Sequence, residues 1–190
     1  RGTFSLAQTT GLTFAAGDGT SDATMTFGGT VANINLAIAT ITWTSAADDD
    51  ADATITVVTT DDEGGSDTDS MTITVNSVND APTTTGGAAT VAEDATHTFT
   101  TTASDWGYAD VDSGDSMTSV DITTLPGTGT LRYGGADVSA GDDIAIANLG
   151  GLTYVPVANA NGAVTFTFKV YDGEALSASA GTSVSYTHLR

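Results

Sequence analysis

Apolar and polar residues alternate along several short segments in the first half of the chain. These segments cover residues 23–27, 38–44, 53–60 and 70–75, with Gly, Asp and Asn between them. Within residues 71–75, for example, Met, Ile and Val alternate with Thr, so every second side chain would lie on one face of an extended strand. The pattern predicts half-buried β-strands separated by tight turns.

The second half of the chain repeats this pattern. Its alternating segments are residues 97–102, 117–123, 129–133, 151–155 and 163–171. In the last segment, period two places Phe166, Phe168 and Val170 on one face. The opposite, outward face would carry Thr165, Thr167 and Lys169. The side chains expected to form the core of this half are Phe99, Val111, Ile122, Leu131, Tyr154, Phe166, Phe168 and Val170.

Short strands at roughly even spacing, with turns between them, are typical of a β-sandwich. We therefore predict an all-β chain made of two tandem immunoglobulin-like or cadherin-like β-sandwich modules. The predicted parts are a partial module over residues 1–78, a linker over residues 79–82, a second module over residues 83–183 and a tail over residues 184–190.

Five short motifs mark the linker and the second module. They are Val-Asn-Asp-Ala-Pro at residues 78–82, Ala-Glu-Asp at 92–94, Asp-Val-Asp-Ser-Gly-Asp at 110–115, Leu-Thr-Tyr-Val-Pro at 152–156 and Tyr-Asp-Gly at 171–173. Together they resemble the cadherin-like tandem repeats of large bacterial adhesins. The resemblance covers residues 80–183 closely, and residues 1–79 resemble a sister repeat.

The resemblance also has implications for the ends of the chain and for its function. It implies that the first module is truncated at its N-terminus, and so poorly closed, and the second at its C-terminus. It further implies a calcium-binding structural or adhesive repeat of a large secreted or cell-surface bacterial protein, acting as a rigid spacer or in cell adhesion. The expected partners are neighbouring repeats of the same chain, with cell-surface glycans or other adhesins as further candidates.

The charge of the chain is strongly negative. Asp and Glu number 24 against 4 Lys and Arg, which gives a formal net charge of -20. Such a surface repels nucleic acid and anionic lipid, because both are bound through Lys and Arg. The chain has no Cys, so packing and metal would have to stabilise an extracellular fold. We expect neither nucleic-acid binding nor membrane insertion.

The carboxylates are clustered in turns, and calcium binds about six to eight oxygen ligands held by turns. We expect loops 105–115 and 172–174 to meet at the linker end of the second sandwich, with Val111 pointing inward, and acidic loop 47–52 of the first module to face them. The predicted calcium ligands are Asp48, Asp49, Asp50, Asn79, Asp80, Asp110, Asp112, Asp115 and Asp172. A second set, at the outer junctions, is Asp61, Asp62, Glu63 and Glu93. The alternative for each carboxylate is a solvated turn residue, since Asp favours turns without metal.

The sequence contains no nucleophile elbow, phosphate-binding loop or zinc-protease motif, and we expect no enzyme activity. The alternative function is a carbohydrate-binding module of a secreted polysaccharide-degrading enzyme, which an exposed platform of aromatic side chains would favour. Trp43 is expected in the core, and His97 is expected to be an exposed strand residue. Trp106 interrupts an acidic loop, where it would be either a packing plug or an exposed ligand contact.

Residues 184–190, Val-Ser-Tyr-Thr-His-Leu-Arg, do not continue the pattern of the second module. They resemble a translated sequencing-adapter string. We therefore expect them to be a non-native tail, and the alternative is an unusual edge strand.

Overall fold

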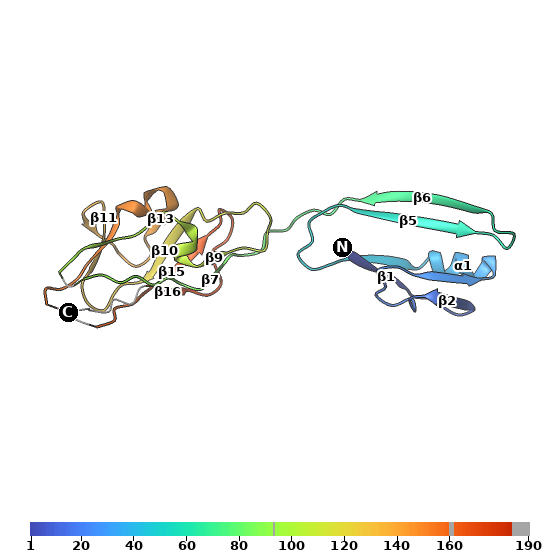
Figure 1. Ribbon diagram of the computed structural model, residues 1–190, viewed down its shortest axis with the longest axis horizontal. Helices are drawn as coiled ribbons and strands as arrows, with labels where there is room; N and C mark the ends of the chain where they lie inside the picture. Colours follow the sequence, from blue (N-terminus) through green and yellow to red (C-terminus); the bar gives the residue numbers. More distant parts are fainter. Residues whose placement is uncertain (93, 160–161, 184–190) are drawn as a thin grey trace. The chain divides into compact units, whose positions relative to one another are not determined.

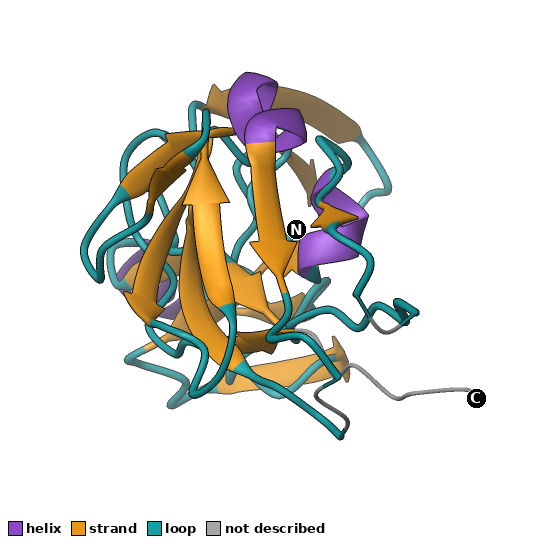
Figure 2. Ribbon diagram, turned by 90° about the vertical axis from the view of Figure 1, so that its left-hand side faces the viewer, coloured by secondary structure: helices purple, strands orange, loops and turns teal. Residues whose placement is uncertain are grey.

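The computed structural model describes residues 1–92, 94–159 and 162–183, and the chain forms two units, Arg1–Val78 and Asn79–Arg190 (Figure 1). Strands dominate, and the helical segments are short (Figure 2). The all-β class predicted from the alternating pattern is therefore confirmed. Glu93 and the tail 184–190 lie outside the described residues.

The first unit is built from pairs of strands. Its elements are β1 (Gly2–Leu6), β2 (Leu12–Ala16), β3 (Thr26–Gly29), α1 (Val31–Ile38), β4 (Ile41–Ser45), β5 (Ala53–Thr60) and β6 (Ser66–Ile73). Antiparallel pairs join β1 to β4, β2 to β3 and β5 to β6. Leu6, Ala37 and Ala53 are buried, whereas Val58 and Met71 are exposed. The first unit thus leaves large apolar side chains in contact with water.

Helix α1 replaces part of a predicted strand. Residues 38–44 were expected to be extended, but Ile38 ends the helix and β4 begins only at Ile41. The helix is preceded by Thr30, whose hydroxyl accepts a hydrogen bond from the N–H of Asn33 at 3.3 Å. This is the contact of an N-capping residue, which stabilises the first turn of a helix. Trp43 on β4 is only partly buried and lies opposite Phe4 of β1.

The second unit contains two four-stranded sheets and a short strand pair within its described residues. Its elements are β7 (Thr83–Thr84), β8 (His97–Thr98), η1 (Ala103–Trp106), β9 (Tyr108–Ala109), β10 (Ser119–Thr124), β11 (Thr130–Tyr133), β12 (Ala136–Asp137), β13 (Asp143–Ala145), η2 (Ile146–Gly151), β14 (Leu152–Val155), β15 (Phe166–Tyr171) and β16 (Gly181–Ser183). The strand orders are β13-β10-β15-β16 and β12-β11-β14-β8, and β7 pairs with β9.

The described residues of the second unit form a buried apolar core, which draws on both four-stranded sheets. The predicted register of β15 is confirmed, because Phe166, Phe168 and Val170 are buried and Thr165 is exposed. Val111 was wrongly predicted to point into the core: its side chain is 59% exposed. It lies in the bend after β9, where the alternation of a strand no longer applies. The core side chains are Phe99, Trp106, Met117, Val120, Ile122, Leu131, Val138, Ile144, Leu149, Leu152, Tyr154, Phe166, Phe168 and Val170.

Several short strands of the second unit differ from the sequence prediction, and β8 and β16 are two of them. The expected strand over residues 97–102 is reduced to the two residues of β8, after which the chain turns into η1. Strand β16 was not predicted, and it pairs antiparallel with the first half of β15. Three residues are too few to display a period of two, so only the pairing with β15 reveals this strand.

Candidate metal site

Three carboxylates of the second unit gather at one point. Asp110, Asp115 and Asp172 each place one carboxylate oxygen within 4.8 Å of the others. The first two lie in the loop between β9 and β10, and Asp172 directly follows β15. Because Ser119 at the start of β10 pairs with Tyr171 at the end of β15, the two acidic loops are neighbours. The convergence of these two loops was predicted from the sequence.

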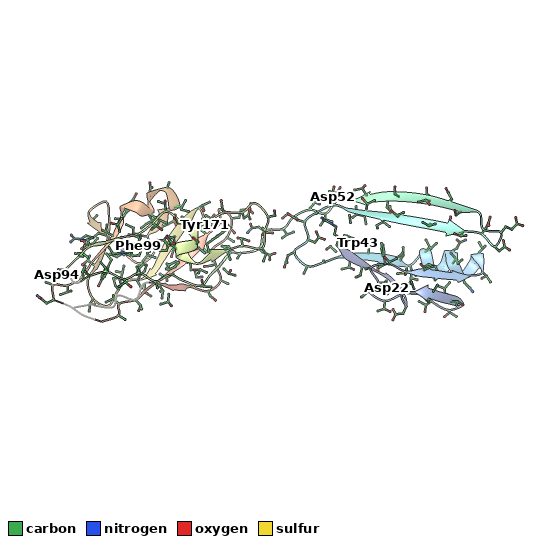
Figure 3. All side chains as sticks on the ribbon, in the orientation of Figure 1. Asp22, Trp43, Asp52, Asp94, Phe99 and Tyr171 are labelled. Atoms are coloured by element: carbon green, nitrogen blue, oxygen red, sulfur yellow. The ribbon has the colours of Figure 1, made fainter. Side chains whose placement is uncertain are left out.

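The pairing of β10 with β15 also fixes where the cluster lies in the second unit. Tyr171 lies toward one end of the unit and Asp94 toward the other, with Phe99 between them (Figure 3). The three clustered carboxylates therefore belong to the end marked by Tyr171. Glu93, the ligand predicted next to Asp94, lies outside the described residues.

Asp172 is held by a dense set of hydrogen bonds. Its Oδ1 accepts from the N–H groups of Glu174 at 2.6 Å and Ala175 at 2.7 Å, and its Oδ2 accepts from Nδ2 of Asn79 at 3.3 Å. The residue is only 9% exposed. Burial alone would raise the pKa of Asp172, but the hydrogen bonds from Ala175, Glu174 and Asn79 together hold that pKa below its ordinary value. Asp172 is therefore held in its charged form.

Asp112 connects the start of the second unit to the acidic loop. Its Oδ2 accepts from the N–H of Asp80 at 2.6 Å, and its own N–H donates to Oδ1 of Asp110 at 3.1 Å. Nδ2 of Asn79 also donates to the carbonyl of Asp80 at 3.1 Å. Asn79 and Asp80 are thus hydrogen-bonded to both acidic loops. One oxygen of Asp112 is used to hold the main chain, and the close group of three carboxylates contains Asp115 instead.

Asp110 is also hydrogen-bonded to a tyrosine. The hydroxyl of Tyr108 donates to Oδ2 of Asp110 at 3.0 Å. Burial raises the pKa of Tyr108 far above its ordinary range, and the hydrogen bond and the negative charges of Asp110, Asp172 and Asp115 raise it further. Tyr108 was assigned no role from the sequence alone. The available signal was an aromatic hydroxyl two residues before an acidic pair.

The pKa of Asp115 is raised above its ordinary value by its position in the cluster. Desolvation raises the pKa of its carboxyl, and the neighbouring charges of Asp112, Asp110 and Asp172 raise it further. Like charges at this separation disfavour one another, and a bound cation would relieve the repulsion.

The donors of the cluster are carboxylate oxygens, which suit calcium or magnesium, whereas zinc is usually bound by nitrogen or sulfur. The residues present therefore fit a hard divalent cation.

Two predicted acidic groups lie in turns of the first unit. Asp48, Asp49 and Asp50 are in the β4–β5 loop, where Oδ1 of Asp49 accepts from Nη1 of Arg1 at 3.2 Å and from the N–H of Ala51 at 3.3 Å. Asp61, Asp62 and Glu63 are in the β5–β6 turn. There Oδ1 of Asp61 accepts from the N–H groups of Glu63 at 3.0 Å and Gly65 at 2.7 Å. Asp49 and Asp61 thus make the contacts of turn-forming residues.

Trp106, whose role the sequence left open, and His97, which was expected to be exposed, are both packed against other rings. Trp106 is 2% exposed, and its ring contacts Phe168 edge to face with centroids 4.9 Å apart, so its role as a packing plug is confirmed. His97 lies on β8 as expected, but it is partly buried and contacts Phe99 with ring centroids 4.8 Å apart. Burial lowers the pKa of His97. The expectation of an exposed histidine was wrong.

Comparison with known proteins places the second unit in a family. A family model of the cadherin-like domain matches residues 78–187. The chain belongs to the cadherin-like domain family. The match includes Asn79, Asp80 and all three clustered carboxylates, so the acidic site is part of the cadherin-like domain. No curated protein matches the chain.

A search of solved structures found an endo-fucoidan hydrolase of glycoside hydrolase family 107. The two chains are 19% identical with a TM-score of 0.32, and the alignment covers 95% of this chain and 24% of the hydrolase. The chain spans about a quarter of the length of that protein, and a TM-score this low carries no argument about function. No helix among the described residues is long and apolar enough to cross a membrane.

Proposed function

We propose that the chain is a calcium-binding structural repeat of a large secreted or cell-surface bacterial protein, with a spacer or adhesive role and no catalytic one. The observation that carries the proposal is the convergence of Asp110, Asp115 and Asp172 at a point where Asn79 and Asp80 are also hydrogen-bonded. Membership of the cadherin-like family supports it, as does the net charge of -20.

The roles of the individual residues follow from their hydrogen bonds. Asp110, Asp115 and Asp172 would hold the ion, which supplies positive charge that offsets their mutual repulsion. Asp172 is already charged and fixed by main-chain N–H groups, so it can act as the rigid ligand of the set. Asp112 holds the main chain of Asp80, and Asn79 contacts Asp172, so both residues that open the second unit are bound to the loops that would carry the ion.

This arrangement suggests a mechanical role. Without a cation, repulsion among the carboxylates favours separation of loops 105–115 and 172–174, and the hydrogen bonds to Asn79 and Asp80 weaken with it. With a cation the loops stay together, and the segment of Asn79 and Asp80 that opens the unit stays ordered. When the opening segment of every repeat is ordered, a string of repeats becomes a stiff spacer, with neighbouring repeats of the same chain as its partners. Extracellular calcium modules typically bind with dissociation constants of about 0.1–1 mM, which suits a secreted protein.

Calcium titration of the full chain tests the proposal. Isothermal titration calorimetry should show binding, and the thermal midpoint of the second unit should rise, because a ligand at about a hundredfold excess over its dissociation constant stabilises the folded state by about 2.7 kcal/mol. The double substitution Asp110→Asn with Asp115→Asn should remove most of the binding heat and most of the shift. Asp67→Asn on β6 of the first unit is a control that removes an exposed carboxylate from another part of the chain.

The proposal fails if the unaltered chain binds no calcium at millimolar concentration. It also fails if the double substitution binds as the unaltered chain does, because the cluster would then consist of solvated turn residues. Equal losses in the double substitution and in Asp67→Asn would point to a diffuse effect of net charge.

A further inference from the structure

The acidic loop 105–115 of the second unit is anchored in the core by a tryptophan near its start. Trp106 lies between Phe168 and Phe99, with ring centroids 4.9 Å and 5.4 Å away, and its Nε1 donates to the carbonyl of Thr100 at 3.1 Å. In addition, the hydroxyl of Thr84 on β7 donates to the carbonyl of Trp106 at 2.7 Å. The start of the loop is therefore fixed by both packing and hydrogen bonds.

Gly107 carries the chain from Trp106 to Tyr108 through a conformation that other residues disfavour. Its φ is 64°, in the left-handed region, and a Cβ atom here would lie 2.5 Å from Oγ1 of Thr85 and 2.6 Å from the carbonyl oxygen of Gly86. Directly after it, Tyr108 enters β9, where it pairs with Thr84 of β7. The main chain of Tyr108 is thus held by its pairing with β7, and its side chain leaves from a defined position.

Tyr108 and Asp112 together occupy both oxygens of Asp110. The tyrosine hydroxyl donates to Oδ2 at 3.0 Å, and the N–H of Asp112 donates to Oδ1 at 3.1 Å. A carboxylate with one fixed donor on each oxygen has little rotational freedom. Asp110 is partly buried, so these donors compete with less water than they would on an open surface.

We propose that Tyr108 is a positioning residue of the acidic cluster, whose hydroxyl fixes the orientation of Asp110 toward Asp115 and Asp172 and thereby raises the affinity of the cluster for calcium. The inference rests on the proposed function. Its physical basis is pre-organisation: a carboxylate that is already oriented loses less freedom when a cation binds. Groups that orient metal ligands in this way typically change metal affinity by about 10–100-fold when they are removed.

The test uses calcium as the probe and the full chain. Tyr108→Phe removes the hydroxyl and keeps the ring, and we expect its calcium dissociation constant to rise by about tenfold in isothermal titration calorimetry. Tyr133→Phe on β11 removes a hydroxyl from a ring beside Gly151 and should change the constant less than about twofold. Tyr171→Phe is a second control, for the loss of a tyrosine hydroxyl nearer to the cluster. This hydroxyl donates to the carbonyl of Gly173 at 2.8 Å, in the other acidic loop.

A spectroscopic readout separates positioning from a general loss of stability. A cation at Asp110 changes the electrostatic environment of the tyrosine hydroxyl that donates to it, so calcium should shift the near-ultraviolet tyrosine absorption of the unaltered chain. The shift should persist in Tyr133→Phe and Tyr171→Phe and vanish in Tyr108→Phe. If Tyr108→Phe does not fold, absence of the shift in the unaltered chain, or its loss in either control, overturns the contact.

The outcomes distinguish this inference from the proposed function. Calcium binding by the unaltered chain, with an unchanged constant and an unchanged absorption shift in Tyr108→Phe, overturns the role of Tyr108 and leaves the proposed function standing. Absence of calcium binding in the unaltered chain overturns both. An affinity loss of equal size in Tyr108→Phe and Tyr133→Phe also overturns the inference, because a remote hydroxyl would then matter as much.

Discussion

The main-chain N–H of Asp80 donates a hydrogen bond to Oδ2 of Asp112 across 2.6 Å. The acceptor is a carboxylate, and hydrogen bonds to charged groups are stronger than those between neutral groups. The contact joins the segment that opens the second unit to the loop that carries the acidic cluster. Order in this segment and order in the cluster are therefore linked through one side chain.

Asp112→Ala should weaken this link. Loss of the acceptor is expected to destabilise the second unit by about 1–2 kcal/mol, and to speed hydrogen exchange at the N–H of Asp80 by about tenfold or more. Two-dimensional NMR exchange of the metal-free chain measures this directly. Asp112→Asn retains an acceptor oxygen and should show a smaller increase. Unchanged exchange at Asp80 in Asp112→Ala would show that the hydrogen bond does not form in solution.

Asp115→Asn should stabilise the metal-free protein at neutral pH. Desolvation and the charges of Asp112, Asp110 and Asp172 raise the pKa of Asp115, so its charged form costs stability above that pKa. As the pH falls through the raised pKa, Asp115 takes up a proton and this cost disappears. The gap between the variant and the unaltered chain should therefore narrow in acid, in urea unfolding followed at several pH values. A gap that widens in acid would contradict this electrostatic account.

Asp172→Asn should change the stability of the metal-free protein in the opposite direction. The hydrogen bonds of Asp172 lower its pKa, so its charged form adds stability above the pKa of the unfolded chain, and this stability is lost as the pH falls through the lower folded value. We expect the variant to be less stable at neutral pH by about 1–2 kcal/mol, and to approach the unaltered chain in strong acid. The same urea series measures both variants. If Asp115→Asn and Asp172→Asn changed stability in the same direction at neutral pH, the assignment of opposite pKa shifts to the two residues would be refuted.

Val111→Ala and Phe168→Ala test which of these two side chains belongs to the core. Val111 is exposed, so its truncation should change stability by less than about 0.5 kcal/mol. Phe168 is fully buried between the sheets, and its truncation should cost about 3–5 kcal/mol. Chemical denaturation of the two variants gives the comparison. A large loss in Val111→Ala would mean that this side chain points inward after all.

Much of the second unit could be predicted because its signals are local. Backbone geometry in a strand places alternate residues on opposite faces, so the sequence of β15 was enough to assign Phe166, Phe168 and Val170 to the core. The same rule misled at Val111, since the chain leaves the strand geometry after β9. It also missed α1, whose start depends on the single capping contact of Thr30 with Asn33.

Part of the candidate site could likewise be predicted from the sequence, and part could not. By itself the sequence determined an all-β chain with a strongly negative charge and acidic turns at residues 110–115 and 172–174. Only the tertiary structure decided that Asp115 rather than Asp112 joins Asp110 and Asp172, and that Tyr108 holds Asp110. The reason is physical: side chains in turns follow no period. Their directions are set by the individual partners that the fold supplies, some of them far away in the chain, as Asp80 is for Asp112 and Asn79 for Asp172.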